Sequence, residues 1–231
     1  MISIGRQSGS QFDEESFDEL KAEYKRIALT EAEKYTYAIK LAKELNIEVT
    51  QDEINSEFDR HLKIGGVDRS EEGFLKIIRD NFGLSRGEYE RMLYLTLIKA
   101  KVEMAIDEEA NKTSDEVERI LADNGNDYKN VAEQLGDKII YEETGGMVDD
   151  KNIDGGRAAE AMKLEPDQSS GKFVSANGDG YYFVKLIKKS ESEVDFVSIK
   201  IPFKEFAKRF DMLKNDNKII EHIDLKVSEE V

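Results

Sequence analysis

Residues 180–186, Gly-Tyr-Tyr-Phe-Val-Lys-Leu, form the most informative stretch of this 231-residue chain. Aromatic and β-branched side chains dominate it, as is typical of a strand. It follows another β-rich run, 172–175, and the turn between them at 176–179 contains Asn-Gly, a strong hairpin signal. Residues 194–201 alternate between two faces and predict a further strand. The second half of the chain is therefore expected to hold an antiparallel sheet.

The first half of the chain has helical periodicity instead. From about 13 to 46, apolar side chains recur every 3.6 residues, and Thr30 is expected to begin a second helical segment. Another amphipathic helix is expected at 71–81. A helix of about 204–213 and a short strand at 223–227 should follow the sheet.

Three helix starts carry a capping box, in which a hydroxyl residue is followed three positions later by Glu. Each partner of such a box satisfies a backbone donor that the helix leaves unpaired. The boxes begin at Thr50, Ser85 and Thr113. The helix after Ser85 is expected to run to about residue 110, so residues 1–112 should form a helical bundle.

Composition limits the classes of function. The formal net charge is −16 and 36% of residues are charged, which argues against a general nucleic-acid binder or a ligand of anionic membranes. There is no apolar run of about 18 residues that could span a bilayer, and Met1–Gly5 is too short for a signal peptide. The absence of cysteine points weakly to a location outside the cytoplasm.

Motifs for cofactor chemistry are missing. The sequence has no phosphate-binding Walker loop, no Gly-x-Ser-x-Gly, and no His or Cys at metal-ligand spacing. Asp149, Asp150 and Asp154 lie close together but lack the spacing of a calcium-binding loop and predict a solvated acidic loop. Neither a cofactor nor a metal ion is expected.

Two segments resemble the parvulin-type prolyl isomerases. Their last strand usually reads Gly-Tyr-His-Ile-Ile-Lys-Leu, which is similar to residues 180–186 with Tyr182 in place of the histidine. Residues 161–171, Ala-Met-Lys-Leu-Glu-Pro-Asp-Gln-Ser-Ser-Gly, resemble the family's Ala-Phe-Ser-Leu-Lys-Pro-Gly-Glu-Val-Ser-Gly. From 113 to 187 the order of helices, glycine pairs and strands matches the latter part of a parvulin domain.

Residues 35–107 resemble a second family module. Their order of helices, Gly-Gly break and Phe-Gly-Leu-Ser turn is similar to the N-terminal chaperone module of SurA- and PrsA-type foldases. Together the resemblances imply an α+β fold with two lobes. A helical chaperone module should span 1–112 and a parvulin-like lobe with an antiparallel sheet 113–201, while 202–231 should pack back on the helices.

The parvulin resemblance implies a set of pocket residues. Parvulins lower a barrier of about 20 kcal/mol with two histidines, an Asp or Cys, and a Met or Leu plus two Phe that hold the proline ring. On alignment, Ile153 takes the Met/Leu position, and Arg157 and Met162 take the Phe positions. Tyr182 and its neighbour Phe183 complete the expected substrate-binding set. A charged Arg157 cannot line a dry pocket without a partner, so the site is expected to be catalytically degenerate.

The first parvulin strand, which carries the other histidine, has no counterpart in its usual place, because residues 108–112 lack strand character. We hypothesise that 194–201 replaces that strand, which puts Ser198 near the second histidine position. A placement of 194–201 outside the sheet would exclude this arrangement. The chain's histidines, His61 and His222, are expected to lie outside the pocket.

The resemblance implies an extracytoplasmic folding factor, at the cell surface or in the periplasm. Its partners would be unfolded or nascent secreted polypeptides, bound in a cleft between the two lobes, with no nucleic acid and no membrane insertion by this chain. The resemblance is also compatible with a homodimer and with a membrane anchor outside this chain. Two alternatives remain: an active prolyl isomerase with an altered pocket, and an adaptor protein of the cell envelope.

Overall fold

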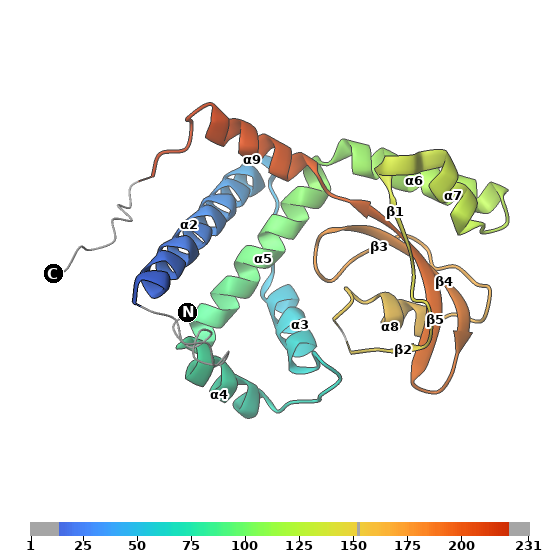
Figure 1. The fold of residues 1–231 in the computed structure, drawn as a ribbon, viewed down its shortest axis with the longest axis horizontal. Coiled ribbons are helices and arrows are strands. Elements are labelled where there is room, and N and C mark those ends of the chain that lie inside the picture. The colour runs from blue at the N-terminus through green and yellow to red at the C-terminus, as the bar shows by residue number, and fades with distance from the viewer. Residues whose placement is uncertain (1–13, 152, 222–231) are drawn as a thin grey trace.

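The computed structural model describes residues 14–151 and 153–221 and confirms the predicted α+β fold class (Figure 1). The N-terminal half forms a helical module that lies beside a lobe built on an antiparallel sheet. The module consists of α2 (Glu14–Leu45), α3 (Gln51–Leu62), α4 (Glu71–Phe82) and α5 (Arg86–Ile106).

Local sequence signals explain where most of these helices begin and end. The capping boxes at Thr50 and Ser85 form as predicted, and Ser70 caps α4 through the backbone N–H of Gly73. Gly83 ends α4 in the left-handed conformation, with φ of 69°. The expected break at Thr30 is wrong: α2 is continuous through that residue, because no glycine or proline interrupts residues 14–45 and a hydroxyl residue alone does not end a helix.

Two apolar clusters hold the module together. In one, Ala38 of α2 packs with Ile98 and Val102 of α5. In the other, Phe58 of α3 and Phe74 of α4 meet Tyr89 of α5, with ring centroids 5.4–6.1 Å apart and edge-to-face geometry. The long α5 is therefore the shared support of the module.

The sheet contains β1 (Ile140–Glu143), β2 (Val148–Asp149), β3 (Phe173–Val174), β4 (Gly180–Lys189) and β5 (Glu193–Pro202). Its order is β1-β5-β4-β3, all antiparallel, and β2 also pairs with β5. The third predicted strand therefore lies inside the sheet. Neither β1 nor β2 was predicted, since both are short and β1 reads Ile-Tyr-Glu-Glu with no alternation of buried and exposed residues.

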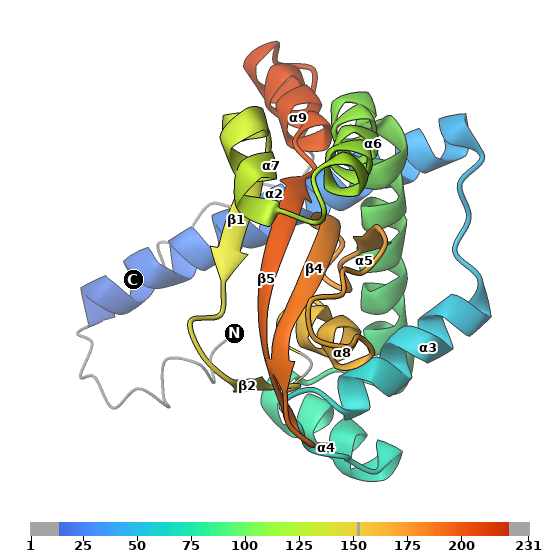
Figure 2. The ribbon, with the colours of Figure 1, turned by 90° about the vertical axis from the view of Figure 1, so that its right-hand side faces the viewer.

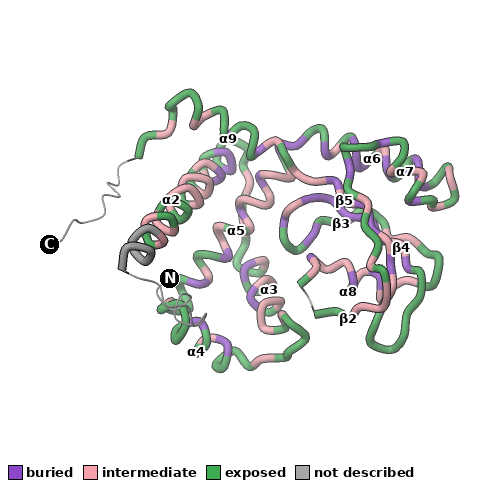
Figure 3. Tube along the Cα trace, viewed as in Figure 1, coloured by how far each residue is buried: buried purple, intermediate pink, exposed green. Residues whose placement is uncertain are grey.

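Helices cover both faces of the sheet (Figure 2). One face packs on α6 (Glu108–Asp123) and α7 (Tyr128–Leu135), whose apolar side chains meet Phe183 and Ile199. The other face packs on the short α8 (Arg157–Met162), which meets Val184 and Phe196. Buried residues accordingly follow β4 and β5 and the end of α2 nearest α9 (Figure 3). The α8 face is the one turned toward the helical module.

The boundary between module and lobe is corrected to Asp107. The helix α6 begins at Glu108, not at Thr113, and Asp107 is its cap. Ser114 is fully buried inside α6 and its hydroxyl donates to the backbone carbonyl of Asn111. The residues from 108 onward pack against the sheet, so they belong to the lobe.

The chain returns to the helical module after β5. There α9 (Glu205–Asn215) places Phe206 in the cluster of α2 and α5 and against the ring of Tyr37, 5.3 Å away. The predicted strand at 223–227 and His222 lie outside the described residues.

An ionic cluster in α3 gives the first testable prediction. Arg60 and His61 lie 2.6 Å and 3.0 Å from a carboxylate oxygen of Glu57, and His61 also contacts the hydroxyl of Tyr89. Burial raises the pKa of Glu57, but the hydrogen bonds of Arg60 and His61 outweigh it and lower the pKa to about 2.

A carboxyl whose pKa is lowered by folding stabilises the fold above its unfolded pKa, and this contribution is lost as the pH falls. Glu57→Gln should therefore reduce the free energy of unfolding at pH 7 by about 1–2 kcal/mol, after allowance for solvent screening. It should also flatten the decline in stability between pH 4.5 and about 2. Urea titrations across that range test both effects, with Glu23→Gln on the exposed side of α2 as control.

Candidate functional site

The candidate site lies on the sheet face that α8 covers. Because strand residues alternate between faces, Tyr182 of β4 shares this face with its cross-strand partner Lys200 of β5. Ser198 lies two positions from Lys200 and pairs with Glu142 of β1. The two residues predicted at the histidine positions, Tyr182 and Ser198, are therefore on one face and on adjacent strands.

Arg157, at the start of α8, is the centre of one polar group. Its guanidinium forms an ion pair with Glu142, approaches the hydroxyl of Ser198 at 3.5 Å, and donates to the backbone carbonyl of Asp154 at 3.0 Å. Its terminal carbon lies 5.4 Å from the centroid of the Tyr182 ring, within the range of a cation–π contact. The partner that a half-buried arginine requires is thus Glu142.

Tyr182, Asp179 and Lys200 form the adjoining polar group. The Lys200 ammonium pairs with Asp179 and lies 5.5 Å from the Tyr182 ring centroid. The Tyr182 hydroxyl donates weakly to Asp179, at 3.4 Å. The Phe173 ring is stacked against the Tyr182 ring, with the two centroids 6.0 Å apart. Tyr182 is only 4% exposed.

The pKa shifts of this group all favour the states present at neutral pH. Burial raises the pKa of Tyr182. Burial alone would lower the pKa of Lys200, but the hydrogen bond that Lys200 donates to Asp179, together with its interaction with Tyr182, outweighs burial and the net shift is upward. Burial raises the pKa of Asp179, but the hydrogen bond and charge of Lys200 lower it, and the net shift is downward. Tyr182 and Lys200 therefore stay protonated and act as hydrogen-bond donors, unsuited to accepting a proton as a general base.

A cavity of about 560 Å³ opens beside Arg157. Ile153, Arg157 and Ser198 all line it, together with Phe196 and the acidic residue Glu142. Ile153 is 65% exposed. The structure thus brings three of the predicted site residues into one cavity, and Tyr182 adjoins them through Arg157.

Two predicted substrate-binding residues lie elsewhere. Phe183 is a correction: it is 1% exposed and packs on the opposite face with α6 and α7. Neighbouring residues of a strand point to opposite faces, so Phe183 could not share a pocket with Tyr182. Met162 packs into the apolar cluster beneath α8 with Val184 and Leu186 and does not line the cavity.

The sequence interpretation missed Glu142, Asp179 and Lys200. A buried arginine indicates that a carboxylate must be near, but it does not identify which of the chain's 50 acidic residues fills the role. Lys200 could have been found from strand alternation, because it lies two residues from Ser198. Over the described ranges 14–151 and 153–221, no group of three or more His, Cys, Asp or Glu side chains is arranged to hold a metal ion.

Comparisons with models of known protein families, with curated proteins and with solved structures gave no significant match. Among the described residues, no helix has the length and apolar character needed to cross a membrane.

Proposed function

We propose that this chain is an extracytoplasmic folding factor that binds unfolded or nascent secreted polypeptides, and that its parvulin-like lobe does not catalyse prolyl isomerisation. The observation that supports the lack of isomerase activity is the Arg157–Glu142 ion pair. It occupies the place where a proline ring would need a dry, apolar wall. Seating the ring there would desolvate both charges or separate them, and either step costs several kcal/mol.

The residues at the two histidine positions support the same conclusion. Tyr182 and Ser198 replace the histidines that the resemblance leads one to expect, and His61 lies in the helical module, bonded to Tyr89 and Glu57. The position of β5 in the sheet is compatible with our proposal that it substitutes for the missing first strand.

Client binding requires exposed apolar surface, and the helical module supplies it. Ile77, Phe82 and Met92, on α4 and α5, are 45%, 54% and 39% exposed. Exposed large apolar side chains on a stable helical support suit binding of unfolded segments, and a flexible methionine adapts to varied sequences. The net charge of −16 helps to keep complexes with such clients soluble.

The test of binding is suppression of aggregation. The protein should prevent aggregation of a reduced, unfolded client at stoichiometric concentration. Phe82→Ser should weaken client affinity by about fivefold, equivalent to about 1 kcal/mol for a half-buried aromatic contact. Val174→Ser, which removes an exposed apolar side chain from the sheet lobe, is the matched control. Unchanged aggregation at equimolar protein would refute the proposal.

The test of catalysis is a protease-coupled prolyl peptide assay. We expect no acceleration above the uncatalysed rate, and Arg157→Ala should leave that result unchanged. An isomerase with an altered pocket would instead accelerate the reaction and lose the acceleration in Arg157→Ala. A cell-envelope adaptor would give a single stable partner in pull-down experiments and no effect on client aggregation.

A further inference from the structure

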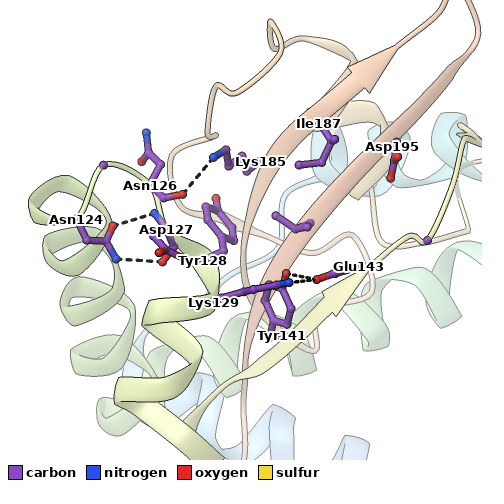
Figure 4. A pocket seen from close by; sticks show the side chains of 13 residues that line it. Asn124, Asn126, Asp127, Tyr128, Lys129, Tyr141, Glu143, Lys185, Ile187 and Asp195 are labelled. Atoms are coloured by element: carbon purple, nitrogen blue, oxygen red, sulfur yellow. Dashed lines mark hydrogen bonds and ion pairs between the residues drawn. The ribbon is translucent and has the colours of Figure 1, made fainter.

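A second cavity, of about 690 Å³, lies on the sheet face opposite Arg157 (Figure 4). The loop between α6 and α7 forms one wall, and β1, β4 and β5 form the floor. The side chains that matter for its chemistry are Tyr128, Tyr141, Lys185, Ile187, Asp195 and Val197. None of these residues belongs to the candidate site described above.

Tyr128 contributes a buried hydroxyl without a partner. The residue is 3% exposed, and its hydroxyl has no hydrogen-bond partner among the described residues. The hydroxyl of Ser169 is close enough to interact weakly with it, but neither oxygen has a partner in good hydrogen-bond geometry. Burial raises the pKa of Tyr128 to about 12, although Ser169 opposes the shift. A buried hydroxyl without a well-placed partner is costly, and an acceptor that reached it from the cavity would gain a hydrogen bond.

Lys185 contributes an incompletely satisfied ammonium to the same cavity. Its side chain is 21% exposed, and the closest carboxylate is the strongly exposed Asp167, at 3.7 Å. Its hydrogen bond to the backbone carbonyl of Asn126 is long at 3.4 Å. In Figure 4 the Tyr128 hydroxyl points toward this ammonium. The Lys185 ammonium, one of whose three N–H groups donates to Asn126, and the Tyr128 hydroxyl therefore face the same region of the cavity.

The other charges in the cavity limit what an acceptor can be. Glu143 is paired with Lys129 at 3.3 Å and accepts from the Tyr141 hydroxyl at 2.5 Å. Asp195 accepts from the hydroxyl of Thr144 at 2.6 Å. Asp127, the third carboxylate of the lining, caps α7. Against these three carboxylates the lining has two lysines, of which Lys129 is paired, so a dianion such as phosphate is disfavoured and Lys185 is the cation left to face a ligand. A singly charged carboxylate fits this balance.

The floor beside Lys185 is apolar. Ile187 is 43% exposed, and Val197 and the Tyr141 ring adjoin it in the cavity. A ligand with an apolar side chain next to its carboxylate would cover these groups while its oxygens reach the donors. Polypeptide segments have this combination.

We propose that this cavity binds a polypeptide carboxylate, from an Asp or Glu side chain or from a chain terminus, with the neighbouring apolar side chain on Ile187 and Val197. The site deepens the proposed function, on which it rests, by giving the client a charged anchor in addition to the apolar helical surface.

Four peptides distinguish the sources of the carboxylate. Acetyl-Ala-Leu-Glu-Leu-Ala-amide and its Gln counterpart test the side chain, and acetyl-Ala-Leu-Ala-Leu as free acid and as amide tests the terminus. Titration calorimetry with the full chain should show that at least one carboxylate peptide binds about tenfold more tightly than its neutral counterpart. Amide NMR shifts should locate the change at Tyr128 and Lys185.

Lys185→Gln should remove that tenfold preference, whereas Lys208→Gln on exposed α9 should keep it. Tyr128→Phe should weaken carboxylate binding while its melting temperature equals or exceeds that of the wild type, because the deleted hydroxyl has no partner in good hydrogen-bond geometry among the described residues. A lower melting temperature with unchanged binding would show that the hydroxyl is only structural. Equal binding of carboxylate and neutral peptides would overturn the site. If aggregation is still suppressed, the proposed function survives that outcome.

Discussion

Asp107→Ala is expected to lower the free energy of unfolding by about 4 kcal/mol, because one carboxylate serves two helix starts. One oxygen accepts from the backbone N–H of Ala110 at 2.9 Å and caps α6. The other accepts from Lys204 at 2.6 Å and Glu205 at 3.0 Å, at the start of α9. Asp107 is 4% exposed, so removal leaves three shielded donors unpaired, at about 1–2 kcal/mol each.

Because Asp107 lies between the helical module and the sheet lobe, its substitution should destabilise more than the start of one helix. The chain passes from the helical module to the sheet lobe at Asp107, and it returns from β5 to α9 at Lys204. The Asp107 carboxylate therefore links the two segments that connect the helical module with the sheet lobe. Thermal unfolding should show a Tm lower by about 8–16 °C, and limited proteolysis should cut first at 107–108 or 203–205.

Two variants control this prediction. Asp107→Asn keeps one acceptor oxygen but places an amide donor against backbone donors, so its loss should be intermediate. Asp127→Ala removes an exposed cap of α7 that accepts one bond, from Asn130 at 3.1 Å, and should cost about 1 kcal/mol. If Asp107→Ala lowers the free energy of unfolding no more than Asp127→Ala does, the Asp107 carboxylate does not link the two connecting segments.

Asp107 also shows why the lobe boundary could not be read from the sequence. The Thr113 box satisfied the local rule as well as the boxes at Thr50 and Ser85 did, but Asp107 offers a cap that bonds both α6 and the distant α9. A local sequence pattern predicts the start of a helix when the capping side chain accepts only from backbone N–H groups of that same helix. It fails where a tertiary partner almost a hundred residues away decides which residue is used.

The same distinction separates the predictable and unpredictable parts of the candidate site. Strand alternation would have excluded Phe183 from the face of Tyr182, although the sequence prediction included both. That Ser198 shares this face follows from the register of β4 with β5. The need of Arg157 for a partner was predictable from the cost of burying a charge. Glu142 was not, because it lies on β1, a polar strand that becomes recognisable only by pairing with β5.

Gly178→Ala is the other change with a large expected effect, about 3 kcal/mol. Gly178 is in the turn between β3 and β4, at φ of 67°, where a Cβ atom would lie 2.5 Å from the Cβ of Ala100 on α5. Alanine pays about 1–2 kcal/mol for that backbone conformation, and the overlap adds a similar amount. Since this turn is where the sheet lobe touches α5, relief of the overlap requires the lobe to move away from the helical module.

A double-mutant cycle separates the backbone strain from the overlap. Ala100→Gly alone should cost about 1 kcal/mol, as for glycine inside a helix, but in the Gly178→Ala background it should restore stability by removing the obstructing methyl. Gly87→Ala, also on α5 but with no atom within 4 Å of the added Cβ, should be neutral or stabilising. Small-angle scattering should show a larger radius of gyration for Gly178→Ala and a wild-type value for the double variant. Additive stabilities with unchanged dimensions would mean that the turn does not set how closely the two lobes pack.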